Sequence, residues 1–103
     1  MVEELSNHGE FDKFIEKGIC VIDFWASWCM PCIMMAPVFD EVSEKFAKHK
    51  FGKLNIDDNK EIAAKFKIMS IPCIVFFKNG KEVGRSIGNV SAEVLEERIR
   101  AIK

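Results

Sequence analysis

The spacing of hydrophobic and polar positions changes repeatedly along the chain, and each change marks a predicted element. Short runs of β-branched and aromatic residues, typical of buried strands, predict strands over residues 19–25, 51–57 and 73–78. Asn79-Gly80, a strong hairpin signal, connects the last of these to a further strand over 81–87. A weaker pattern at residues 2–6 favours an edge strand.

Apolar residues at steps of three and four predict helices between these strands. Met35, Phe39 and Val42 give the longest helix its apolar face, and Gly18 and Ser91 are typical stop and cap residues for two others. The predicted helices cover residues 8–17, 29–49, 60–66 and 92–102.

The order of these elements predicts an α/β fold. A strand–helix–strand unit followed by a hairpin and a helix implies a central mixed sheet of four to five strands, with helices on both faces. The chain has no repeat, linker or low-complexity segment. We therefore expect residues 1–103 to form a single domain.

Composition and charge narrow the class of protein. Hydrophobic residues make up 49% and charged residues 30% of the chain, as in compact soluble proteins. The net charge of −1 disfavours a nucleic-acid binder, which usually carries a basic excess. No apolar run reaches the roughly 18 residues that span a bilayer, and acids stand where a secretory signal would carry Lys or Arg. We expect a cytoplasmic protein without membrane contact.

The Cys29-Met30-Pro31-Cys32 motif lies where the strand over 19–25 gives way to the longest helix. The first N–H groups of a helix are unpaired and partly positive, so they would stabilise a thiolate at Cys29 and lower its pKa below the roughly 8.5 of a free cysteine. Pro31 suits a first helical turn. Cys32 could then attack a mixed disulfide formed at Cys29, which predicts a dithiol that cycles with a disulfide.

Two observations from the residues allow alternatives. Cys-x-x-Cys also supplies half of a zinc site, but Cys20 and Cys73 are isolated and form no second ligand pair, which favours redox chemistry. Asp23 places an acid inside a buried strand. It is either a core carboxyl satisfied by a hydrogen bond, or a group whose pKa desolvation raises toward the range used in proton transfer.

The segment Trp28-Cys29-Met30-Pro31-Cys32, preceded by Asp23-Phe24-Trp25-Ala26, resembles the active-site segment of the thioredoxin family. The resemblance extends over essentially the whole chain. Further matching segments are Lys53-Leu54-Asn55-Ile56-Asp57, Ile71-Pro72, Phe77-Lys78-Asn79-Gly80 and Gly88. The resemblance implies a thioredoxin fold and the activity of a protein-disulfide reductase, with Cys29 as nucleophile and Cys32 as resolving thiol. The redox-active disulfide replaces any cofactor, and no metal is expected.

The resemblance also implies roles for residues around the dithiol. Asp23 would assist deprotonation of Cys32 through water. Lys53 would lie near Asp23 and modulate its charge, unless it is a solvated surface lysine. Pro72 would be a cis proline facing the dithiol. An apolar docking surface for an extended peptide, which also includes Ile33, would be formed by Trp28, Met30, Pro31, Ile71, Pro72 and Gly88.

The implied partners are disulfide-containing protein substrates and a thioredoxin reductase or equivalent electron donor. The protein itself is expected to be a monomer. Met30 and Ile33 depart from the family's usual glycine and lysine, and Cys73 stands where threonine is common. Cys73 is either an inert core residue or close enough to take part in the dithiol chemistry. The absence of histidine between the cysteines favours a reductant. Glutaredoxin-like or isomerase-like exchange, or a non-enzymatic metal or iron–sulfur module, are the alternative functions.

Overall fold

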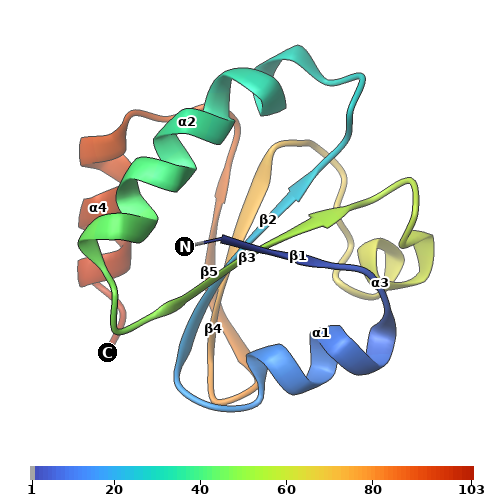
Figure 1. The fold of residues 1–103 in the computed structure, drawn as a ribbon, viewed down its shortest axis with the longest axis horizontal. Helices are drawn as coiled ribbons and strands as arrows, with labels where there is room; N and C mark the ends of the chain where they lie inside the picture. The colour runs from blue at the N-terminus through green and yellow to red at the C-terminus, as the bar shows by residue number, and fades with distance from the viewer. Residues whose placement is uncertain (1) are drawn as a thin grey trace.

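The computed structural model describes residues 2–103, and within them five strands form one mixed sheet (Figure 1). The strands are β1 (Val2–Leu5), β2 (Ile19–Trp25), β3 (Lys50–Asn55), β4 (Cys73–Lys78) and β5 (Lys81–Ile87). Their order across the sheet is β1-β3-β2-β4-β5. β3 pairs in parallel with β1 and β2, whereas β4 is antiparallel to β2 and to β5. The predicted mixed sheet is confirmed, with all five strands present.

Helices cover both faces of the sheet, as predicted. The helices are α1 (His8–Ile15), α2 (Met30–Lys45), α3 (Lys60–Lys65) and α4 (Ala92–Arg100). Figure 1 shows α2 and α4 on one face and α1 and α3 on the other. Each helix pair closes its own hydrophobic core, so the sheet separates two apolar layers.

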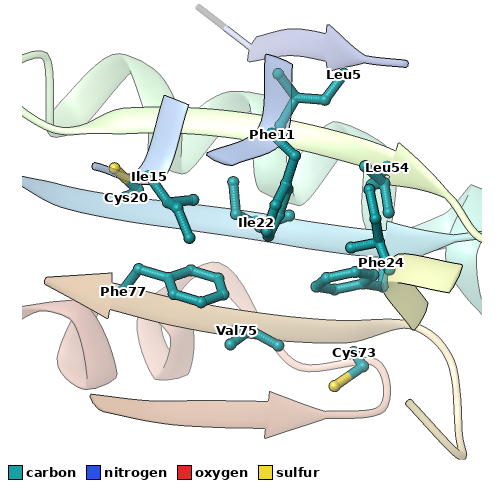
Figure 2. Packing of buried hydrophobic residues seen from close by; sticks show 11 residues of the cluster. Leu5, Phe11, Ile15, Cys20, Ile22, Phe24, Leu54, Cys73, Val75 and Phe77 are labelled. Atoms are coloured by element: carbon teal, nitrogen blue, oxygen red, sulfur yellow. The ribbon is translucent and has the colours of Figure 1, made fainter. Parts of the chain in front are cut away.

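The core beneath α1 and α3, which we call the α1/α3 cluster, draws side chains from all strands except β5 (Figure 2). Its buried members are Leu5, Phe11, Ile15, Cys20, Ile22, Phe24, Leu54, Ile62, Cys73, Val75 and Phe77. The α2/α4 cluster on the other face consists of Val21, Met35, Phe39, Val42, Phe51, Ile74, Phe76, Leu95 and Ile99. Because successive strand residues point to opposite faces, the two lists alternate along β2 and β4.

β2 lies at the centre of the sheet, between β3 and β4, and this position decides the environment of Asp23. Ile22 and Phe24 belong to the α1/α3 cluster, and Val21 belongs to the α2/α4 cluster. Asp23, two residues after Val21, therefore points toward the α2/α4 face. A carboxyl group thus stands inside the sheet on the side covered by α2.

Several predicted ends were wrong by two or more residues, and two of them have a clear local cause. The longest helix ends at Lys45 rather than at residue 49, because Phe46 leaves helical geometry with φ −117° and ψ 57°. β3 ends at Asn55 rather than at residue 57, since the Asn55 side chain turns the chain by accepting the N–H of Asp57 at 2.9 Å. Both errors arise where one residue stops an element that its apolar pattern would have continued.

The predicted cap of α4 is confirmed, and α3 begins without a side-chain cap. The Ser91 hydroxyl accepts the N–H of Val94 at 3.2 Å and caps α4. Asn59 stands at the N-cap position of α3, but its side chain makes no capping bond there. Its amide instead donates to the carbonyl of Asn55 at 3.0 Å, which fastens the loop that follows β3.

Candidate active site

The two cysteines of the Cys-x-x-Cys motif lie at the start of α2, directly after β2. The turn that links β2 to α2 is closed by a hydrogen bond from the N–H of Cys29 to the carbonyl of Ala26, at 3.2 Å. Cys29 occupies the N-cap position and Cys32 lies in the first turn. They are joined by a disulfide, with their Cα atoms 5.2 Å apart. Their exposed fractions are only 5% and 2%, so both cysteines are nearly buried and Cys29 is slightly the more exposed.

The sulfur of Cys29 is positioned to carry negative charge. Its Sγ accepts the N–H of Cys32 at 3.2 Å, in the way that a capping oxygen does at other helices. The first turn of α2 contains no acidic residue. A thiolate at Cys29 would therefore meet the positive end of the helix and a direct N–H donor without a repelling neighbour in that turn.

Asp23 is completely buried, with an exposed fraction of 0%. Within residues 2–103, neither of its carboxylate oxygens accepts a hydrogen bond from another protein group. The structure therefore does not support a core acid that is satisfied by another protein group. Burial raises the pKa of Asp23 from 3.8 to about 7, opposed by the positive charge of Lys53. A carboxyl with this pKa can take and release a proton near neutral pH.

Lys53 lies opposite Asp23 in the parallel register of β2 and β3. Its side chain is half-buried, and its ammonium stands 4.7 Å from the centre of the Trp25 ring, within cation–π distance. The interpretation of Lys53 as a solvated surface lysine does not fit this placement. The structure puts its charge near Asp23, where it lowers the pKa of the carboxyl against the larger effect of burial.

The loop before β4 brings a backbone carbonyl next to the disulfide. The bond between Ile71 and Pro72 is cis, as the family resemblance implied. The carbonyl oxygen of Ile71 lies 3.8 Å from Cys29 Sγ, and the carbonyl of Pro72 accepts the N–H of Gly88 at 2.8 Å. Gly88 has φ +89°, a left-handed conformation that glycine adopts without strain. This second bond fixes the end of β5 beside the Pro72 loop.

Apolar side chains surround the disulfide and remain open to solvent. Trp28, Met30 and Ile33 have exposed fractions of 67%, 64% and 49%, which is unusual for side chains of this size and type. Ile71 is half-buried and packs against the cluster that contains both cysteines. We call Trp28, Met30, Ile33 and Ile71 the apolar rim. An exposed apolar surface beside a reactive group is typical of a docking site.

Asp57 is a functional candidate that the sequence reasoning missed. Its carboxylate accepts the indole N–H of Trp28 at 2.9 Å and so sets the orientation of the largest side chain in the rim. In the sequence, Asp57 stood out only as part of the segment 53–57 that resembles the thioredoxin family. The available signal was the run of acids directly after β3, at the same sheet edge as the end of β2, because β2 and β3 are parallel.

The two other cysteines belong to the α1/α3 cluster and not to the cluster that contains the dithiol. Cys73 belongs to the α1/α3 cluster beside Phe24 and Val75, on the face of the sheet opposite α2 (Figure 2). Burial raises the pKa of the Cys73 thiol. Cys20 is also buried, and its thiol donates to the carbonyl of Phe14 at 3.3 Å. The structure favours the interpretation of Cys73 as an inert core residue.

Residues 2–103 contain neither a metal-binding cluster nor a membrane-spanning helix. Within this range no three His, Cys, Asp or Glu side chains form a group that could hold a metal ion. None of the helices in the same range has the length and apolar character that crossing a membrane requires.

Comparison with known proteins agrees with the geometry. The family model described as Thioredoxin matches residues 2–101. A thioredoxin of Staphylococcus aureus is 42% identical over 89 residues, which cover 85% of this chain and 86% of the relative. Oxidised mitochondrial thioredoxin 3 of Saccharomyces cerevisiae superposes with a TM-score of 0.91 at 31% identity, covering 98% of this chain and 95% of the other. Fasciola hepatica thioredoxin gives 0.88 at 34% identity, with 97% and 99% covered.

Proposed function

The chain belongs to the thioredoxin family, and from this premise we propose which of its residues carry out the reduction of protein disulfides. The protein is a thiol–disulfide oxidoreductase, and Cys29 and Cys32 form its redox-active centre. The observation that carries the assignment of roles is the hydrogen bond from the Cys32 N–H to Cys29 Sγ, at the N-terminus of α2. It distinguishes the two sulfurs chemically, since it supports negative charge on Cys29.

In the first step the Cys29 thiolate attacks one sulfur of a substrate disulfide. The substrate S–S bond breaks as the Cys29–substrate bond forms, and the departing substrate sulfur takes up a proton. Cys29 is the more exposed of the two cysteines and lies beside the Ile71 carbonyl, so its sulfur is the one we expect a substrate to reach. The bonds broken and formed are of the same kind, so the step needs no cofactor.

In the second step Cys32 attacks the Cys29 sulfur of the mixed disulfide. The Cys32 thiol must first lose its proton, and we assign Asp23 as the acceptor, reached through water. Its pKa of about 7 suits this transfer, and Lys53 adjusts the charge on the carboxyl. The second substrate sulfur leaves with a proton. The Cys29–Cys32 disulfide forms, and two electrons have passed from the dithiol to the substrate.

Substrate binding is assigned to the apolar rim together with Pro31, Pro72 and Gly88. An extended peptide laid across this surface would bury Trp28, Met30 and Ile33, and its backbone would meet that of Ile71. Met30 and Ile33 make this surface more apolar than the glycine and lysine usual in the family, so we propose a preference for apolar residues next to the substrate disulfide.

Three further parts of the proposal are the electron donor, the cellular location and the oligomeric state. A thioredoxin reductase or an equivalent donor would return the Cys29–Cys32 disulfide to the dithiol. We propose that the protein acts in the cytoplasm as a monomeric, single-domain electron carrier over residues 1–103. Its composition and the absence of histidine from the motif support this assignment. Turnover supported by a flavoprotein reductase, rather than by glutathione, separates it from glutaredoxin-like exchange.

Substitution of each cysteine tests the assigned roles. We expect Cys29→Ser to abolish reduction of a protein disulfide, and Cys32→Ser to accumulate Cys29-linked mixed disulfides that are visible by mass spectrometry. Cys73→Ala is the matched control, because its thiol lies on the opposite face of the sheet, and it should keep normal turnover. Normal turnover by Cys29→Ser, or mixed disulfides formed through Cys32 instead, would contradict the assignment.

A further inference from the structure

A row of three charged residues crosses the sheet at right angles to the strands. The register pairs Glu4 of β1 with Lys53 of β3, and Lys53 with Asp23 of β2. We call these three residues the charged row. Neighbouring strands lie about 4.8 Å apart, so Glu4 stands two strand spacings, about 10 Å, from Asp23.

All three side chains are on the face covered by α2. Val2 packs against the α2/α4 cluster and Leu5 belongs to the α1/α3 cluster. By strand alternation, Glu4 shares the face of Val2, and Glu3 shares the face of Leu5. Glu4 is exposed at the sheet edge, Lys53 is half-buried, and Asp23 is fully buried. The row therefore runs from solvent to the most buried charge of the site.

We propose that Glu4 is a positioning residue for the reaction, which controls the charge state of Asp23 from the edge of the sheet by attracting Lys53 and repelling the buried carboxylate. This inference rests on the proposed role of Asp23 as proton acceptor for Cys32. It adds a residue that lies on an edge strand, apart from the disulfide and the apolar rim.

Both effects of Glu4 have the same sign. A negative charge at Glu4 repels a second negative charge at Asp23, and it also competes for the one ammonium between them. Each effect disfavours ionised Asp23 and so raises its pKa. The surroundings of Asp23 act in this direction: burial raises its pKa most, Lys53 lowers it, and Glu4 raises it.

The other elements packed around Asp23 add one more acid that acts on its pKa in the same direction as Glu4. Asp40 of α2 also raises the pKa of Asp23. β4 places Ile74 beside Asp23, and β5 continues the row with Ser86, so neither adds charge. α4 contributes Arg98, whose guanidinium donates to Ser86 Oγ at 2.6 Å. Glu4 is the outermost acid of the row. Because its side chain is exposed on the edge strand β1, it can be substituted without disturbing the core.

Glu4→Gln in the oxidised protein tests the inference, because neither active-site cysteine titrates in that state. We expect the titration midpoint of Asp23, followed by the ¹³C resonance of its carboxyl carbon, to move to lower pH by about 0.2 to 0.7 of a pH unit, as for weakly coupled exposed charges. Glu4→Asp should keep most of the wild-type midpoint. The difference between wild type and Glu4→Gln should shrink in 1 M salt, where the Debye length is about 3 Å.

Glu3→Gln is the matched control, since it removes the same charge from the same strand on the opposite face. Its midpoint should equal that of the wild type. An unmoved midpoint in Glu4→Gln, or an equal shift in Glu3→Gln, overturns the role of Glu4.

The pH profile of turnover separates this inference from the proposed function. The acid limb of kcat should move with the Asp23 midpoint in Glu4→Gln, and KM for the protein substrate should stay constant. A moved midpoint with an unmoved kcat profile overturns Asp23 as the proton acceptor, and with it the effect of Glu4 on the reaction.

Discussion

Trp28 combines a largely exposed ring with a fixed orientation. The hydrogen bond from its indole N–H to Asp57 holds the ring at the edge of the disulfide without burying it. Such a side chain loses little freedom when a substrate covers it, which favours binding. The orientation therefore depends on a carboxylate that itself does not belong to the apolar rim.

We expect Asp57→Ala to weaken the binding of protein substrates. Loss of a hydrogen bond of about 1 kcal/mol predicts a rise in KM for a protein disulfide of about fivefold, with a smaller effect on a small aromatic disulfide that barely touches Trp28. Steady-state kinetics with both substrates measure this. Asp58→Ala removes a neighbouring charge and should leave both KM values unchanged; equal effects of the two variants would point to charge alone.

At the residue scale, the sequence predicted the chemistry that depends on neighbouring residues in the chain. Cys29 and Cys32 define a helix start, and Asp23 interrupts a buried strand, so both features could be recognised from short segments. The bond between Trp28 and Asp57 joins residues 29 positions apart and could not. The same holds for the half-burial of Lys53, which depends on Trp25 in the neighbouring strand.

At the scale of single elements, β3 shows how closely the strands and α1 fit together. A Cβ atom added at Gly52 would lie 3.0 Å from Leu5 Cδ1, 3.1 Å from Phe14 Cε2 and 3.3 Å from Ile22 Cδ1. These contacts come from β1, α1 and β2. Glycine at this position lets α1 approach the sheet across the α1/α3 cluster.

Gly52→Ala should therefore destabilise the protein by about 1–3 kcal/mol, the usual cost of adding a carbon to a filled core. Gly84→Ala is a matched control on β5, because its added Cβ would lie at an ordinary 3.5 Å from Phe76 Cδ2. Urea unfolding of the two variants measures the difference. Equal stabilities would show that the α1/α3 cluster can expand to accept the methyl group.

Element types and their order could be read from apolar spacing because each strand and helix buries one face or both. Element ends were less predictable. The stop at Phe46 and the turn at Asn55 depend on backbone angles and on one side-chain hydrogen bond, neither of which changes the apolar pattern. The Asn79-Gly80 hairpin was predicted correctly, since its signal is local.

At the scale of the whole molecule, the buried Asp23 couples stability to pH. Its folded pKa of about 7 lies above its ordinary value of 3.8, so the folded protein binds more protons than the unfolded chain between these pH values. The contribution of Asp23 to the free energy of unfolding must therefore fall as pH rises from 4 to 7, and then level off. The difference of about three units between the two pKa values corresponds to a change of about 4 kcal/mol in this contribution to the free energy of unfolding.

Asp23→Asn should remove this dependence. We expect the oxidised variant to match the wild type near pH 4 and to exceed it by about 4 kcal/mol at pH 8, as measured by urea unfolding at each pH. Contributions of the other carboxyl groups are common to both proteins and cancel in the difference. A difference that stays constant with pH would mean that Asp23 titrates normally in the folded state.

The strand order β1-β3-β2-β4-β5 was not predictable from spacing alone. The sequence indicated a mixed sheet with helices on both faces, but β1 pairs with β3 across 49 residues, from Val2 to Phe51, and the sequence carries no local signal for that contact. The register that aligns Glu4, Lys53 and Asp23 follows from this long-range pairing, and so became visible only in the folded structure.

Glu4, the outer end of the charged row, lies on the edge strand β1, whereas the apolar rim lies around the start of α2. A mutation of Glu4 in β1 can therefore shift the pH range in which the enzyme is active, while the surface that binds substrates stays the same. During divergence, or in protein design, adaptation to a new pH and adaptation to new substrates become separate and independently selectable changes.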